Sequence, residues 1–88
     1  MNVEFRKSFE KDLRKIKDDV ILQKIEAVIE EVENAESLSD VSNIKKLQTE
    51  GDYYRIRVGN YRIGITLSDE VIIFVRVLQR KDIYRYFP

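Results

Sequence analysis

Neither cysteine nor histidine occurs in this sequence of 88 residues. Without cysteine there can be no disulfide, no thiolate metal ligand and no cysteine nucleophile. Without histidine, the side chain that most often titrates near neutral pH is missing, which removes histidine-based acid–base pairs. These two absences exclude several of the commonest kinds of enzyme site.

Long apolar runs are also missing. Residues 1–7 lack the apolar core of a signal peptide, and no run approaches the roughly 20 residues that a membrane span needs. We therefore expect a soluble, cytoplasmic protein. A chain this short buries only about 60% of its unfolded surface, so we expect one domain over residues 1–88 with a single modest core.

The formal net charge is zero, but the charges are unevenly distributed. Residues 1–52 contain 9 basic and 13 acidic residues, whereas residues 53–88 contain 7 basic and 3 acidic ones. All but one of the basic residues in the second part are arginines, which suit bidentate contacts with phosphate. This asymmetry indicates a surface for a polyanion.

A β-hairpin is the clearest local feature. Residues 53–58 and 61–67 both alternate apolar with other residues, and Gly59 and Asn60 lie between them. Glycine and asparagine tolerate the positive φ of a two-residue hairpin turn. The pattern therefore predicts that Val58 pairs with Tyr61.

This register brings arginines together. Arg57 lies opposite Arg62, and Arg55 lies opposite Gly64. Like charges facing each other cost about 0.2–1 kcal/mol, so the arrangement favours a surface that holds phosphates. The glycine would leave room for a molecule to approach the backbone.

Residues 71–80 are almost continuously apolar, which predicts a central strand. If residues 68–70 form the connection, Leu67 pairs with Val71 and Arg62 lies opposite Arg76. One face of the sheet is then wholly apolar and carries Tyr54, Ile56, Val58, Tyr61, Ile63, Ile65, Leu67, Val71, Ile73, Val75 and Val77. The other face carries Arg55, Arg57, Arg62, Arg76 and Arg80 among Ile72, Phe74 and Leu78.

The first half of the chain reads as a short strand and a helical hairpin. We expect a strand at residues 2–5 and a helix at residues 9–17 that Ser8 caps. Asp18 or Asp19 caps a second helix, whose apolar stripe consists of Ile21, Ile25, Val28, Val32 and Ala35. Its glutamates are interpreted as a solvated face, with an acidic flank that orients a partner as the alternative.

Two further segments complete the prediction. Residues 36–43 read as a loop, and residues 81–88 can form a turn of helix that packs Ile83 and Phe87. The fold class is therefore α+β: a short N-terminal strand, a helical hairpin, a three-stranded antiparallel meander and a short C-terminal helix.

Residues 53–62 and 77–85 resemble the RelE branch of the RelE/ParE toxin superfamily, and Lys46-Leu47 followed by Gly51 is similar to that family's approach to the hairpin. The resemblance covers essentially the whole chain and implies a single RelE-like toxin domain with the RelE-like microbial RNase fold. It also implies an mRNA interferase of a type II toxin-antitoxin system. Such an endoribonuclease cleaves mRNA in the ribosomal A site by attack of the ribose 2′-oxygen on the adjacent phosphate.

Carried over residue by residue, the resemblance implies catalytic roles for Arg57, Arg62, Arg80 and Tyr84. RNA-binding roles are expected for Arg55, Arg76, Lys81 and Arg85. No cofactor or metal is implied. Some relatives have lysine at the position of Arg55 and histidine at that of Gln79, so the general acid and base stay open. The alternative function is that of a ParE-like toxin, which inhibits DNA gyrase without cleaving RNA.

The expected partners are the ribosome, mRNA and a RelB-like antitoxin, in a toxin-antitoxin hetero-oligomer with no membrane contact. An amphipathic C-terminal segment of the antitoxin would suit the half-apolar face formed by Ile72, Phe74 and Leu78 beside the arginines.

Overall fold

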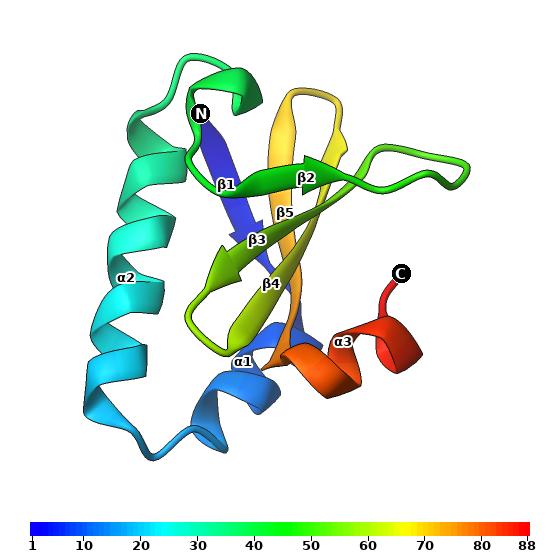
Figure 1. The fold of residues 1–88 in the computed structure, drawn as a ribbon. Helices are drawn as coiled ribbons and strands as arrows, with labels where there is room; N and C mark the ends of the chain where they lie inside the picture. Colours follow the sequence, from blue (N-terminus) through cyan, green and yellow to red (C-terminus); the bar gives the residue numbers. More distant parts are fainter.

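The structure, a computed structural model, describes residues 1–88 and consists of one sheet and three α-helices (Figure 1). The strands are β1 (Asn2–Phe5), β2 (Ile44–Lys46), β3 (Tyr53–Val58), β4 (Tyr61–Ser68) and β5 (Val71–Gln79). The helices are α1 (Lys7–Arg14), α2 (Asp19–Asn34) and α3 (Arg80–Tyr86), and a 3-10 turn, η1, covers Leu38–Asp40. None of the α-helices combines the length and hydropathy of a transmembrane helix.

The strand order is β1-β5-β4-β3-β2. Strand β1 runs parallel to β5, and every other neighbouring pair is antiparallel. The predicted α+β class and meander are confirmed. The meander is extended at both edges, because β1 joins the sheet beside β5 and the short strand β2, which sequence reasoning missed, pairs with β3.

The helical hairpin is confirmed, with one cap correct and one wrong. The Asp18 carboxylate accepts hydrogen bonds from the amides of Val20 at 2.9 Å and Ile21 at 3.3 Å, as an N-cap should. Helix α1 begins at Lys7 and ends at Arg14, earlier than expected at both ends. Ser8 lies inside it and donates its hydroxyl proton to the carbonyl of Val75 at 2.6 Å, so it joins α1 to the sheet and does not cap the helix.

The main core lies between one face of the sheet and helices α1 and α2. Its buried side chains are Phe9, Ile16, Ile25, Val32, Val41, Ile56, Val58, Ile63, Ile65, Ile72, Phe74 and Val77. Burial of such side chains contributes roughly 1.5–3 kcal/mol each, so this face sets which side of every strand points inward. The side chains that alternate with them on β3 and β4 are left on the opposite face.

The predicted register between β4 and β5 is wrong. The connection has two residues, Asp69 and Glu70, both with positive φ (49° and 66°), and Ser68 pairs with Val71. Further along, Ile65 pairs with Phe74 but Gly64 pairs with Arg76, so Val75 is the extra residue of a β-bulge. Arg62 consequently lies opposite Leu78 and not opposite Arg76.

The bulge changes which residues of β5 point inward. Ile72 and Phe74 are fully buried in the main core, and after the bulge Val77 takes the next inward position. Without the extra residue, strict alternation would have brought Arg76 into the core. The prediction that Ile72 and Phe74 lie on the arginine face is therefore wrong, and they cannot form the docking surface expected for an antitoxin.

Helix α3 lies on the other face of the sheet. It buries Ile83 completely, and Phe87 just after it is 5% exposed, which confirms the predicted C-terminal packing. A Cβ atom at Gly64 would lie 2.7 Å from the ring of Phe87. The space opposite Arg55 is thus filled by this ring and not left for a ligand, and it lets α3 sit close to the sheet.

Candidate nucleic-acid interface

The hairpin of β3 and β4 places its arginines as predicted. Arg57 pairs with Arg62 and Arg55 with Gly64, and the turn between the strands uses Gly59 at a φ of 56°. Strand β2 adds a further cation, since Lys45 pairs with Arg55. Because these residues alternate with the core side chains, they share the face on which α3 lies.

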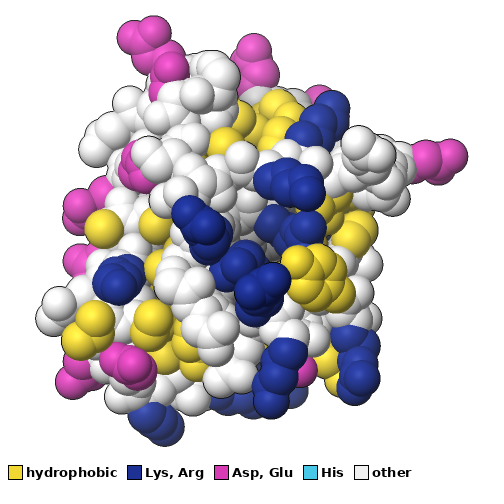
Figure 2. Space-filling model, viewed as in Figure 1, with side chains coloured by type: hydrophobic (Ala, Val, Ile, Leu, Met, Phe, Trp, Pro, Cys, Tyr) yellow, Lys and Arg dark blue, Asp and Glu magenta, His cyan; other side chains and the backbone are white.

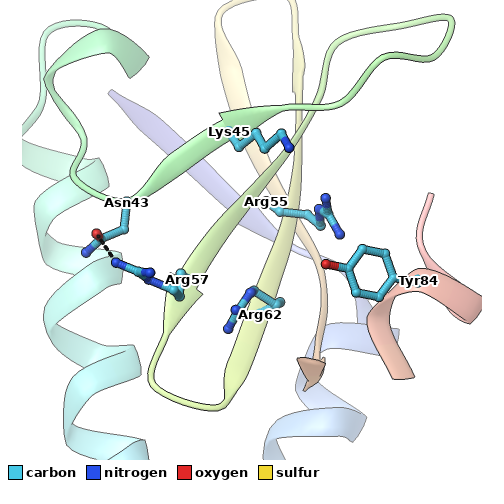
Figure 3. Close-up of a pocket in the computed structure, with 6 residues that line it drawn as sticks. All are labelled: Asn43, Lys45, Arg55, Arg57, Arg62 and Tyr84. Carbon is cyan, nitrogen blue, oxygen red and sulfur yellow. Dashed lines mark hydrogen bonds between the residues drawn. The ribbon is translucent and has the colours of Figure 1, made fainter. Parts of the chain in front are cut away.

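These side chains surround an open cavity of about 270 Å³ (Figure 3). It is lined by Asn43, Lys45, Arg55, Arg57, Arg62 and Tyr84. In the space-filling view, basic side chains gather over the strands of this face, whereas acidic side chains lie mostly at its periphery and along the side of α2 (Figure 2). The cavity is small beside pockets that enclose drug-sized ligands, roughly 300–1,000 Å³, but it can admit a phosphate group.

Two arginines of the cavity, Arg57 and Arg62, are held by neutral acceptors. Arg57 donates from Nη2 to Oδ1 of Asn43 at 3.2 Å. Arg62 donates from Nη1 to the backbone carbonyls of Gly59 at 3.0 Å and Tyr61 at 2.9 Å. These bonds orient the guanidinium groups without neutralising them.

No carboxylate pairs with any cation of the cavity. The two ion pairs of the structure join Lys46 to Asp52 and Arg76 to Asp12, both outside it. The pKa of Arg62 is lowered by burial and then by the charge of Arg80, with smaller contributions of the same sign from Arg57 and Arg55 and an opposing one from Tyr84. The cluster therefore favours an added anion, which would relieve the repulsion.

Tyr84 closes one side of the cavity from α3. Cζ of Arg55 lies 4.4 Å from the centroid of its ring, within the range of a cation–π contact. Its hydroxyl points into the cavity (Figure 3), while the residue as a whole is 62% exposed. The guanidinium groups of Arg55 and, less strongly, Arg80 lower the pKa of Tyr84 below its usual value.

The structure brings together most of the predicted site. Arg80 opens α3, donates its amide proton to the carbonyl of Asn60 at 2.8 Å, and lies beside the cavity, close enough to influence Arg62 and Tyr84. Lys45 and Asn43 were missed. Both come from a segment whose apolar pattern is too short to predict a strand, so no local signal placed them beside the hairpin.

Three predicted RNA-binding residues do not line this cavity. Arg76 donates from Nε and Nη2 to the two carboxylate oxygens of Asp12, at 2.7 and 3.0 Å, so its charge is already paired. Lys81 lines a second cavity that also contains Asp12 and Arg76. Arg85 is exposed on α3, and its side chain takes part in no hydrogen bond or ion pair of the structure.

The fold is that of solved RelE toxins. The chain superposes on the toxin of a RelB-RelE antitoxin-toxin complex from Methanococcus jannaschii with a TM-score of 0.82 and 49% identity, covering 97% of this chain and 99% of that one. An archaeal RelE-RelB complex from Pyrococcus horikoshii OT3 gives a TM-score of 0.73 at 23% identity, covering 90% and 93% of the two chains.

The sequence relationships agree with the fold. Residues 3–84 match the family described as the ParE toxin of type II toxin-antitoxin system, parDE. Over 89 aligned residues, the chain is 52% identical to Toxin RelE3 of Methanocaldococcus jannaschii, with all of both chains covered. The chain therefore belongs to the RelE/ParE superfamily of type II toxin-antitoxin toxins, as a RelE-family toxin.

Proposed function

We propose that the protein is a ribosome-dependent endoribonuclease that cleaves mRNA in the ribosomal A site. The observation that carries this proposal is the set of basic side chains from β2, β3 and β4 that surround one small cavity without a carboxylate partner. An RNA backbone supplies phosphate groups that can settle among them. Tyr84, at the edge of the cavity, can stack on an unpaired base or orient its ribose.

The proposed reaction is the one that the family resemblance implies, and this arrangement of cations suits it. The 2′-oxygen of a ribose attacks the adjacent phosphorus, the bond from phosphorus to the 5′-oxygen breaks, and the products end in a cyclic phosphate and a 5′-hydroxyl. The intervening phosphorane carries more negative charge than the ground state. Arg57 and Arg62, preoriented by their neutral acceptors, stabilise that charge without reorganising.

Arg55 and Arg80 add two further positive charges to those of Arg57 and Arg62. Arg55 lies between Lys45 and the ring of Tyr84, so it can hold the phosphate while it orients the tyrosine. Arg80 does not line the cavity, but its charge acts on Arg62 and Tyr84, and in this proposal it would stabilise the phosphate or the leaving 5′-oxygen. The ribosome would supply a single-stranded codon in a fixed position, which matters because positioning alone can provide several kcal/mol of the barrier reduction.

We infer that a RelB-like antitoxin holds the toxin inactive in a hetero-oligomer, as the RelB-RelE complexes of its relatives suggest. Acidic side chains of such a partner would neutralise the unpaired cations of the cavity. In this proposal, mRNA cleavage and its inhibition by the antitoxin both take place in the cytoplasm, where ribosomes are found.

The proposal is tested by inducing the toxin in cells that lack the antitoxin and mapping mRNA ends by primer extension. Cuts within codons are expected for the wild type, and Arg62→Ala should reduce them by roughly 10²–10³-fold, the usual effect of losing one such donor. Arg14→Ala, an exposed arginine at the end of α1, serves as the control and should leave cleavage unchanged.

The alternative is inhibition of DNA gyrase, which the match to the ParE family keeps open. DNA damage with intact mRNA would support that alternative and reject the nuclease. Undiminished cleavage by folded Arg62→Ala would reject the site.

A further inference from the structure

Asp12 is the one charged side chain that the fold buries, and the proposed reaction does not use it. It lies on α1 and is 5% exposed. Strand β1 pairs with β5 only as far as Phe74, so the next part of that edge of β5 has no strand beside it. Helix α1 takes this place, and Asp12 accepts a hydrogen bond from the amide of Val77 at 3.1 Å. The carboxylate therefore lies at an open edge of the sheet.

Arg76 reaches this edge from the face of the sheet on which α3 lies. It pairs with Gly64, and the space above that glycine is filled by the ring of Phe87, just after α3. Its guanidinium group extends to both carboxylate oxygens of Asp12, at 2.7 and 3.0 Å. A charge-assisted pair with two hydrogen bonds fixes both the position and the plane of a guanidinium group. Helix α1 thus holds a cation that belongs to the opposite face.

The same guanidinium group also contacts α3. Its Cζ atom lies 5.7 Å from the centroid of the ring of Tyr86, within the range of a cation–π contact. A cavity of about 410 Å³ lies between residues of α1 and α3, and Asp12, Arg76 and Tyr86 are all part of its lining. Arg76 therefore bridges this cavity, with a carboxylate of α1 on one side and an aromatic ring of α3 on the other.

Helix α3 depends on such contacts because it is short. It has seven residues, far fewer than the roughly 12–15 below which an isolated helix is marginal. At 3.6 residues per turn, Tyr84 and Tyr86 project about 200° apart, so Arg55 on Tyr84 and Arg76 on Tyr86 contact the helix from opposite sides. Both tyrosines are more than half exposed. Packing alone therefore leaves them loosely placed, and the two arginines set the rotation of α3 about its axis.

We propose that Arg76 is a positioning residue: held by Asp12, it fixes the rotation of α3 through the ring of Tyr86. It thereby sets the place of Tyr84 at the edge of the basic cavity (Figure 3). A change in α1 is then felt at that cavity, although the core of the sheet lies between them. Any consequence for cleavage rests on the proposed function, whereas the coupling itself is a property of the folded chain.

The bridge is tested by hydrogen exchange of the amide of Phe87, which donates to the carbonyl of Ile83 at 2.9 Å at the end of α3. Tyr86→Leu removes the ring and should raise the exchange rate about two- to fivefold, as expected for the loss of one exposed cation–π contact. Tyr86→Phe keeps the ring and should exchange like the wild type. In an Arg76→Met background, Tyr86→Leu should change the rate no further.

A second measurement reports the place of Tyr84. Arg55 is the main cause of the lowered pKa of Tyr84, so a rotation of α3 that separates them should move this ionisation to higher pH. In ultraviolet titration, Tyr86→Leu and Asp12→Asn should both cause this shift, and Tyr86→Phe should not. The direct electrostatic effect of removing the acidic charge of Asp12 has the opposite sign, because it favours the phenolate. A role in stability alone would leave the titration of the folded protein in place.

Both measurements need neither ribosome nor mRNA, so they separate this proposal from the proposed function. If Tyr86→Leu leaves exchange and titration unchanged, or has the same effect in the Arg76→Met background, the positioning role is wrong even where the wild type cleaves mRNA. If both measurements change as expected and the wild type leaves ribosome-bound mRNA intact, the nuclease function is wrong and the positioning role of Arg76 is confirmed.

Discussion

Replacing Asp12 with alanine is expected to destabilise the protein by about 3 kcal/mol. Asp12 is 5% exposed on α1, and its carboxylate accepts two hydrogen bonds from Arg76 and one, at 3.1 Å, from the amide of Val77. These three bonds join α1 to β5 just after the bulge. The pair with Asp12 also raises the pKa of Arg76, so the charged form is the one that the fold stabilises.

The expected loss of stability depends on whether Val77 and Arg76 can find other hydrogen-bond partners once the carboxylate of Asp12 is removed. The amide of Val77 would be left buried without an acceptor, which costs about 1–3 kcal/mol. The side chain of Arg76 is 25% exposed and can turn towards water. Loss of its ion pair with Asp12 therefore adds only about 1–2 kcal/mol, below the 3–5 kcal/mol that breaking a fully buried pair costs. The better helix propensity of alanine returns roughly 0.5 kcal/mol.

Denaturant unfolding measures this change as a lower midpoint at an unchanged slope. In thermal unfolding, about 3 kcal/mol corresponds to a decrease in Tm of roughly 12–24 °C for a domain of this size. Glu10→Ala, an exposed acidic residue on the same helix, should change stability by less than about 0.5 kcal/mol. A loss below about 1 kcal/mol for Asp12→Ala would refute the view that this contact anchors α1 to the sheet.

Three more predictions concern the face of α3. Gly64→Ala should destabilise the fold by about 1–3 kcal/mol, because the added methyl group overpacks against Phe87. In a double-mutant cycle measured by urea unfolding, the same substitution made in a Phe87→Ala background should lose most of this cost. Ultraviolet titration should detect one tyrosine that ionises below the usual pH of about 10. This titration should be absent in Tyr84→Phe and should shift to higher pH in Arg55→Gln. Because the pKa of Tyr84 is lowered in the folded state, its contribution to stability is present above the unfolded pKa and is lost as the pH falls through the folded pKa. Pyrophosphate at low ionic strength should raise Tm, by an amount equivalent to about 2.7 kcal/mol at a concentration 100-fold above Kd, and an Arg57→Gln/Arg62→Gln variant should not respond.

The hairpin of β3 and β4 could be predicted from sequence because two independent signals agree there. Alternation determines which residues of each strand point inward, and Gly59 with Asn60 sets the length of the turn. The pairing of Arg57 with Arg62 followed directly. The same logic identified the side of the sheet on which the basic cavity lies.

The register of β5 could not be predicted in this way. Its residues are apolar almost without interruption, and strict alternation favours burial of Val71, Ile73, Val75 and Val77, because the other alternate set contains Arg76. Two features decide the outcome: a two-residue turn at Asp69 and Glu70, whose positive φ is uncommon for these residues, and the bulge at Val75 that keeps Arg76 out of the core. Neither has a distinctive local signature.

Long-range partners account for the remaining errors in the site. Arg76 is paired because Asp12, which is 64 residues away in the chain, lies beside it in the fold. Lys45 enters the cavity because β2, only three residues long, pairs with β3. Periodicity over three residues carries too little information to predict a strand, so the contribution of Lys45 depended on the tertiary structure.

The most direct measurement for the whole account is the rate at which purified toxin cleaves mRNA on programmed ribosomes, compared between the wild type, Arg62→Gln and the control Arg14→Gln. We predict products with a cyclic phosphate and a 5′-hydroxyl, and a decrease on the order of 10²–10³-fold for Arg62→Gln alone, with an unchanged circular dichroism spectrum. Equal rates for all three proteins would contradict the claim that the unpaired arginines of this cavity carry the reaction.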